Sequence, residues 1–138
     1  MKTLLLSILL STTIFANDYS EGYNVYKNKC SSCHAEKMSR DQVLKNMHTL
    51  KAPPMLEISN RLKQNVITLD DDDDIKRQLI IAFVKEYIDN PSLDYSMCSA
   101  VALEKFGVMP SQKGKLSDRE KQAVSEWLYD SFEGIKFQ

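Results

Sequence analysis

The amino-acid sequence predicts an all-α domain. Apolar residues recur at three- and four-residue spacing in successive segments, whereas no segment convincingly shows the alternation expected of a half-buried strand. Only four Gly and four Pro stand among the 138 residues, too few for the frequent turns of a β-sandwich or barrel. Two capping boxes, beginning at Ser39 and Ser117, mark the starts of helices.

The composition is that of one ordinary soluble domain. Hydrophobic residues make up 43% of the chain and charged residues 27%, which argues against both disorder and a membrane bundle. Eighteen Lys and Arg against 19 Asp and Glu give a net charge of −1, without the basic excess of a nucleic-acid-binding protein. Three cysteines are too few for a disulfide scaffold.

Residues 1–16 have the pattern of a secretory signal peptide. Lys2 supplies a positive charge, and a short, largely apolar stretch from Leu4 to Ile14 leads to Ala16 and then to polar residues. As a helix this stretch would span about half of a bilayer's hydrocarbon core, which argues against an uncleaved anchor. We therefore expect cleavage after Ala16, export to the periplasm and a mature domain over residues 17–138.

Three helices are expected in the first half of the mature chain, over residues 20–29, 39–47 and 55–62. The first and third rest on helical spacing of apolar and aromatic residues. The second begins at the capping box of Ser39 and is stopped by the Pro53-Pro54 pair. The residues that mark these helices are Gly22, Tyr23 and Tyr26; Val43, Leu44 and Met47; and Met55, Ile58 and Leu62.

Three further helices are expected over residues 75–87, 95–106 and 117–128. Asn90-Pro91 ends the first, Gly107 is well suited to end the second, and the capping box of Ser117 opens the third. Their marking residues are Ile75, Leu79, Phe83 and Tyr87; Tyr95, Cys98, Ala102 and Phe106; and Ala123, Val124, Trp127 and Leu128. On this stripe Cys98 is expected to be a small buried hydrophobic residue, with a dimerising disulfide or a redox role as the alternative.

Five consecutive aspartates, residues 70–74, precede the fourth expected helix. A calcium loop would need spaced oxygen ligands with a Gly and a distal Glu, and the run lacks this pattern. Negative charge near a helix N-terminus is favourable against the helix dipole. We therefore expect a solvated, acidic helix start.

Cys30-Ser31-Ser32-Cys33-His34 is a C-x-x-C-H motif, the signature of covalent haem attachment. Two thiols three residues apart face one way on a helical turn, where they can form thioethers with the two vinyl groups of haem. The adjacent His34 then lies under the iron as an axial ligand. Export supports this interpretation, because c-type haem is attached outside the cytoplasm.

Three other interpretations of the C-x-x-C-H motif have less support in the sequence than haem attachment. A structural zinc site needs four Cys or His ligands, and a second pair could only be Cys98 with His48. A dithiol oxidoreductase would place its C-x-x-C near a βαβ pattern, which this chain lacks. A disulfide between Cys30 and Cys33 would explain neither His34 nor the helical context.

The residue pattern leaves the second axial ligand open among Met38, Met47, His48, Met55, Met97 and Met109. Met47 and Met97 occupy expected helices, where packing is the simpler role. Met55 follows a rigid Pro-Pro pair and is the serious rival of Met109. Met109 stands in Phe106-Gly107-Val108-Met109-Pro110, far enough from His34 in sequence for the chain to wrap around a haem.

The chain resembles the class I, monohaem cytochrome c family. The resemblance covers nearly all of residues 18–131 and rests on three features: a first helix that runs into C-x-x-C-H, the late Gly-Val-Met-Pro stretch at residues 107–110, and a capped last helix with Trp127. The segment between Met55 and Pro91 is longer than in the most compact members.

The resemblance implies a helical domain wrapped around one covalently bound haem c. It also implies that Gly22 and Tyr26 pack against Trp127 where the terminal helices cross. The site residues that it implies are Cys30 and Cys33 for haem attachment and His34 and Met109 as the iron ligands.

The expected function is periplasmic electron transfer between donor and acceptor oxidoreductases, without catalysis by the chain itself. Two alternatives stay open. One is a peroxidase-like or ligand-sensing haem whose Met109 dissociates, with His48 as the only other histidine to assist chemistry. The other is a cytochrome subunit of a larger periplasmic complex, which an exposed apolar face would favour. A basic collar for docking is expected from the lysines that flank the two ligand segments: Lys27, Lys29, Lys37, Lys105, Lys113 and Lys115.

Overall fold

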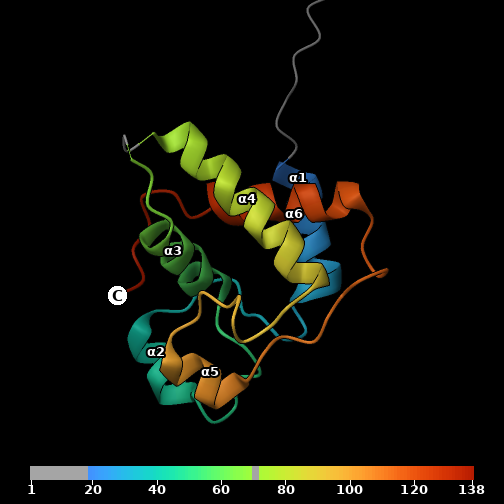
Figure 1. The fold of residues 1–138 in the computed structure, drawn as a ribbon. Coiled ribbons are helices and arrows are strands. Elements are labelled where there is room, and N and C mark those ends of the chain that lie inside the picture. The colour runs from blue at the N-terminus through green and yellow to red at the C-terminus, as the bar shows by residue number, and fades with distance from the viewer. Residues whose placement is uncertain (1–18, 70–71) are drawn as a thin grey trace, which may run out of the picture.

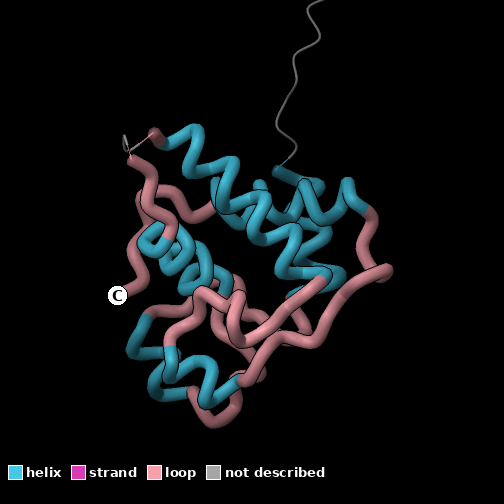
Figure 2. Tube along the Cα trace, in the orientation of Figure 1, coloured by secondary structure: helices cyan, strands magenta, loops and turns pink. Residues whose placement is uncertain are grey.

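The computed structural model describes residues 19–69 and 72–138. The predicted signal peptide, residues 1–16, lies outside the described residues, as do two of the five aspartates. The described ranges are helical and hold no strand, which confirms the predicted all-α class (Figures 1 and 2). The elements are α1 (Tyr19–Val25), its π-helical continuation η1 (Tyr26–Cys30), α2 (Arg40–Asn46), α3 (Met55–Asn65), α4 (Asp73–Asp89), α5 (Ala100–Phe106) and α6 (Asp118–Asp130).

The first and last helices cross in close contact, as predicted. A Cβ atom added at Gly22 would collide with the Trp127 Cβ and the Ala123 carbonyl, so the helices approach closely because Gly22 has no side chain. The ring of Tyr26 stacks on Trp127 with 4.6 Å between centroids and 17° between planes. Tyr26 and Trp127 are both buried.

Helix α4 lies across α6 (Figure 1) and is tied to it at both ends. Arg77 donates two hydrogen bonds to the Asp130 carboxylate, at 2.9 and 2.6 Å. Near the other end, Lys121 Nζ lies 2.7 Å from Asp89 Oδ2. The acidic start is confirmed where it is described, since Asp72 is the N-cap residue and its carboxylate accepts from two backbone N–H groups of the first turn.

The apolar stripe expected to bury α4 is partly wrong. Ile80 and Ile81 are the buried residues of this helix, whereas Ile75 and Leu79 are 51% and 49% exposed. Helix α4 packs against α6 and α3 through a neighbouring stripe. The spacing identified a helix, but a helix with apolar residues on several stripes does not specify which stripe its neighbours cover.

Capping residues set the other boundaries. Both capping boxes are present, Ser39 with Gln42 and Ser117 with Glu120. The helix expected over residues 95–106 begins only at Ala100, because the Ser99 hydroxyl accepts from the Ala102 N–H and caps it there. Tyr95, Met97 and Cys98 therefore precede α5. The second helix ends at Asn46, well before the Pro-Pro pair, and Pro54 instead serves as the N-cap of α3.

Candidate functional site

A cavity of about 300 Å³ lies between the C-x-x-C-H segment, α3, α4, α6 and the loops on either side of α5. This volume falls at the lower end of the range of small-molecule and cofactor sites. Most of the residues that line it are apolar. The four site residues inferred from the sequence, Cys30, Cys33, His34 and Met109, all line this one cavity.

The two cysteines of the motif lie one turn apart. The chain leaves η1 at Cys30, whose carbonyl accepts from the N–H groups of both Cys33 and His34, at 3.1 and 3.0 Å. This tight turn brings Cys30, Cys33 and His34 to the same cavity. The thiols of Cys30, Cys33 and Cys98 are all free.

The His34 ring is held in one orientation. Its Nδ1 lies 2.8 Å from the Pro53 carbonyl oxygen, and since a carbonyl can only accept, Nδ1 carries the hydrogen. Burial lowers the pKa of His34, which favours the neutral ring. The lone pair is then on Nε2, which is the arrangement required of a histidine that ligates a metal.

The surroundings of Cys30 do not suit a dithiol oxidoreductase. Burial, with a further contribution from Cys33, raises the pKa of the Cys30 thiol to about 11. Redox-active thiols of C-x-x-C motifs have lowered pKa values, because the thiolate is the nucleophile. The thiol environment therefore argues for a role other than thiol–disulfide exchange.

Three of the six candidates for a second axial ligand line the described cavity wall: Met55, Met97 and Met109. Met38, Met47 and His48 are not among the residues that form it. The sequence predicts a helix at Met97, where packing is the simpler role, but Met97 precedes the Ser99 cap and lines the cavity.

Met55 is fixed beside the histidine segment. Its N–H donates to the Ala35 carbonyl at 2.8 Å, and the next N–H, of Leu56, donates to Glu36 at 3.1 Å. With the bond between His34 and Pro53, three contacts join residues 53–56 to residues 34–36. These contacts place the backbone of Met55 on the same side of the cavity as the segment that carries His34.

Four charged side chains also line the cavity: Lys29, Lys51, Arg61 and Glu57. Burial raises the pKa of the Glu57 carboxyl, and the charge of Arg61 opposes that rise. Three cations and one carboxyl beside largely apolar walls suit a ligand that is mostly apolar and carries negative groups. Haem, with its two propionates, has this chemistry.

Comparison with known families adds to this geometry. The family described as cytochrome c oxidase, cbb3-type, subunit III matches residues 17–128. The chain belongs to this family of c-type cytochrome domains. Membership makes it a haem c-binding electron-transfer domain, and a largely apolar cavity walled by C-x-x-C-H and methionines fits that cofactor.

One similar protein comes from Aquifex aeolicus (strain VF5) and is described as an uncharacterized protein. It is 38% identical over 144 residues, which cover 96% of this chain and 89% of the relative. No solved structure gives a significant match to the chain.

Within residues 19–69 and 72–138, no three His, Cys, Asp or Glu side chains gather as a metal site would require, so the zinc interpretation finds no site there. In the same part of the chain, no helix combines the length and apolarity needed to cross a membrane.

Proposed function

We propose that the chain is an exported monohaem cytochrome c that carries single electrons between oxidoreductases. The observation that carries the proposal is the convergence of Cys30, Cys33, His34 and Met109 on one largely apolar cavity, although Met109 is far from the others in sequence. Residues 1–16 are proposed as the cleaved signal peptide and residues 17–138 as the mature domain, which places the protein in the periplasm.

Each site residue has a separate role in this proposal. Cys30 and Cys33 would attach the haem through thioethers, and His34 Nε2 and Met109 Sδ would ligate its iron. When bound, haem c supplies a centre whose iron changes charge by one electron. The chain holds His34 in a fixed tautomer through Pro53 and lines the site largely with apolar side chains.

We propose that the chain is an electron carrier and not an enzyme. With both His34 and Met109 as ligands, haem iron would have no open position at which a substrate could bind. His48, the histidine that a peroxidase-like reaction would have used, is exposed and is not part of the described cavity wall.

Absorption spectra of the purified protein in both oxidation states test this function. We expect the spectrum of haem c in the reduced protein and the weak Fe–Met charge-transfer band in the oxidised protein. Mass spectrometry of the denatured chain should show the haem still attached and the N-terminus at Asn17. Haem lost on denaturation would contradict covalent attachment, and replacement of both Cys30 and Cys33 by Ala is the matched control.

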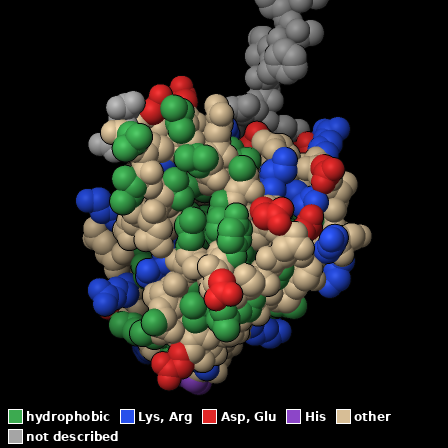
Figure 3. Space-filling model, viewed as in Figure 1, with side chains coloured by type: hydrophobic (Ala, Val, Ile, Leu, Met, Phe, Trp, Pro, Cys, Tyr) green, Lys and Arg blue, Asp and Glu red, His purple; other side chains and the backbone are tan. Residues whose placement is uncertain are grey.

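An exposed apolar face on α4 favours a second candidate function, that of a subunit in a larger complex. Ile75 and Leu79 are half exposed, and their stripe continues to Phe83, which stacks on the half-exposed Tyr95 at 5.4 Å. Figure 3 shows hydrophobic side chains gathered over α4. Phe83 also lines the cavity, so this face adjoins the proposed haem site.

The charges around the α4 face indicate the chemistry of its partner. The exposed charged residues close to it in sequence are acidic, whereas the basic residues of the helix, Lys76, Arg77 and Lys85, are partly buried. The acidic residues are Asp72, Asp73 and Asp74 at the start of the helix, Glu86 near its end, and Asp94 beside Tyr95. We infer a protein partner that presents an apolar surface bordered by Lys and Arg. Like charges on two copies of this face would oppose self-association.

Replacement of one exposed apolar residue tests the complex-subunit function. The chain and a Leu79→Ser variant would each be purified with an affinity tag from the native source, with Val101→Ser as a control at an exposed apolar residue of α5. We expect Leu79→Ser alone to lose a stoichiometric oxidoreductase that co-purifies with the wild-type chain. A wild-type chain that purifies alone, or as a dimer, would contradict the heteromeric complex.

A further inference from the structure

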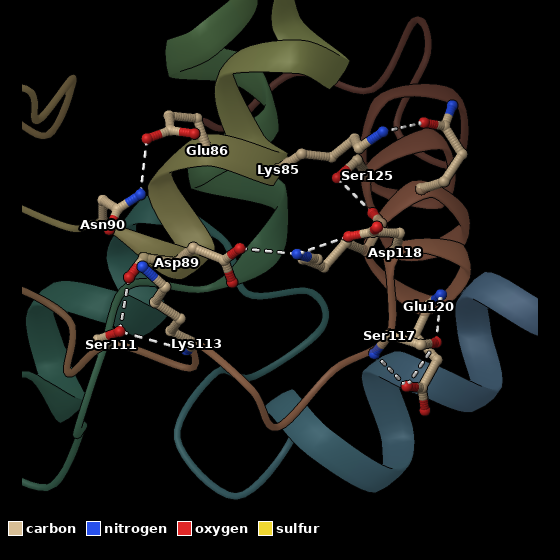
Figure 4. A network of polar contacts seen from close by, with 12 residues as sticks. Lys85, Glu86, Asp89, Asn90, Ser111, Lys113, Ser117, Asp118, Glu120 and Ser125 are labelled. Carbon is tan, nitrogen blue, oxygen red and sulfur yellow. Dashed lines mark hydrogen bonds and ion pairs between the residues drawn. The ribbon is translucent and has the colours of Figure 1, made fainter.

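The segment that follows Met109 is hydrogen-bonded to the end of α4. Helix ends leave backbone carbonyls without partners inside the helix. At the end of α4, the carbonyl of Ile88 accepts from the Gln112 N–H at 2.9 Å, and that of Asp89 accepts from the Ser111 hydroxyl at 2.6 Å. Ser111 and Gln112, two and three positions after Met109, thus bond these two carbonyls, and Figure 4 shows the contact between Ser111 and Asp89.

The Ser111 hydroxyl also organises its own loop. Its oxygen accepts from the Lys113 N–H at 3.2 Å while its hydrogen is donated to Asp89. Gln112 is part of the cavity wall, as are Met109 and Ile88. The hydroxyl therefore joins the methionine segment to the helix at the border of the cavity.

The end of α4 is itself anchored. The Asp89 side chain is 19% exposed and pairs with Lys121 of α6, which is 12% exposed and also contacts Asp118 at 2.9 Å (Figure 4). Helix α6 in turn packs on α1, which leads through η1 into Cys30. A continuous series of contacts connects the Met109 segment to the C-x-x-C-H segment around the cavity.

We propose that Ser111 is a positioning residue for Met109. It holds the methionine segment against the α4 carbonyls and so keeps Met109 at the cavity, opposing its displacement by a competing ligand. This role rests on the proposed haem ligation by Met109. Because Ser111 is exposed, its replacement is expected to leave the packing of the core intact.

Displacement of the methionine by added imidazole measures this role in the oxidised holo-protein. Loss of the Fe–Met band would be followed against imidazole concentration for the wild type and for Ser111→Ala. If the Ser111 bond breaks on displacement, its removal should raise the apparent affinity for imidazole about two- to tenfold, the worth of one neutral hydrogen bond. Ser111→Thr, which keeps the hydroxyl, should restore an affinity close to that of the wild type.

Ser92→Ala is the matched control. Ser92 is exposed and its Oγ accepts from the Tyr95 N–H at 3.2 Å, so the variant also loses a turn hydrogen bond, but not at the methionine segment. A merely structural role for Ser111 would lower the unfolding midpoint and leave imidazole affinity unchanged, and that result would overturn the proposal.

Failure of the two proposals can be told apart. A wild-type protein without the Fe–Met band would reject ligation by Met109, and the positioning role with it. A wild-type protein with the band, and with equal imidazole affinity in Ser111→Ala and Ser92→Ala, would reject only the positioning role.

Discussion

The crossing of α1 with α6 and the segment 107–117 differ in the contacts that hold them. The crossing is apolar and close-packed: Gly22 lies against the last helix, and Tyr26 stacks on a Trp127 that is 4% exposed. The segment that carries Met109 is largely exposed and is held by hydrogen bonds at the end of α4.

This difference separates stability from ligation. Burial of large aromatic side chains contributes several kcal/mol, whereas a single exposed hydrogen bond contributes about 1 kcal/mol or less. Changes at the crossing should therefore unfold the domain, and changes in the segment 107–117 should alter the iron ligand while the fold persists.

The largest effect is expected at the crossing. Trp127→Ala removes a buried ring that contacts Tyr23, Tyr26 and Phe132. The holo-protein should lose about 3–5 kcal/mol of unfolding free energy, measured by denaturant melts. A loss below about 1 kcal/mol would show that the crossing does not dominate the stability of the domain.

Met109→Ala tests whether the segment 107–117 supplies an iron ligand. It should abolish the Fe–Met band and lower the reduction potential, because a methionine ligand raises the potential relative to stronger donors. The covalent haem and the helical circular dichroism should persist. Met55→Ala and Met97→Ala should retain the band; its loss in either of them, with retention in Met109→Ala, would transfer the ligand role.

Asp130→Asn is expected to cause an intermediate loss of unfolding free energy. The variant weakens a two-hydrogen-bond pair with Arg77 that joins α4 to α6, in which the two side chains are 29% (Arg77) and 13% (Asp130) exposed. We expect a loss of about 1–2 kcal/mol in denaturant melts. Glu21→Gln is the control, since its partner Arg119 is 81% exposed and such surface pairs contribute about 0–1 kcal/mol. Equal losses in both variants would show that burial does not set the strength of these pairs.

The smallest effect on the fold is expected at the lysine collar. All six collar lysines are exposed, and Lys29 also borders the cavity. Lys29→Glu and Lys113→Glu should leave stability unchanged but slow association with an acidic redox partner, far more than Lys136→Glu does. Added salt should slow the wild-type reaction steeply, because steering is screened over about 10 Å at 0.1 M. Equal effects at all three positions, or a rate independent of salt, would reject the collar.

Several features could be predicted from the sequence because they depend on neighbours along the chain. The capping boxes at Ser39 and Ser117 need only a hydroxyl and a side-chain acceptor three residues later. The turn that brings Cys30, Cys33 and His34 together is likewise local. The approach of Gly22 to Trp127 is long-range, and the family resemblance predicts it, whereas residue spacing does not.

Other features were decided by the tertiary structure. Helix α4 buries Ile80 and Ile81 in place of Ile75 and Leu79, because its neighbours cover that stripe. Met97 lines the cavity, and it precedes α5 because Ser99 caps that helix after it. Met55 lies beside the histidine segment because its N–H donates to the Ala35 carbonyl and the Leu56 N–H donates to the Glu36 carbonyl. The chemical groups of the site can be predicted from the sequence, because the spacing of the C-x-x-C-H motif acts over only a few residues. Helix caps are equally local. Which methionines line the cavity depends on contacts between segments far apart in the chain, and such contacts form only when the domain folds.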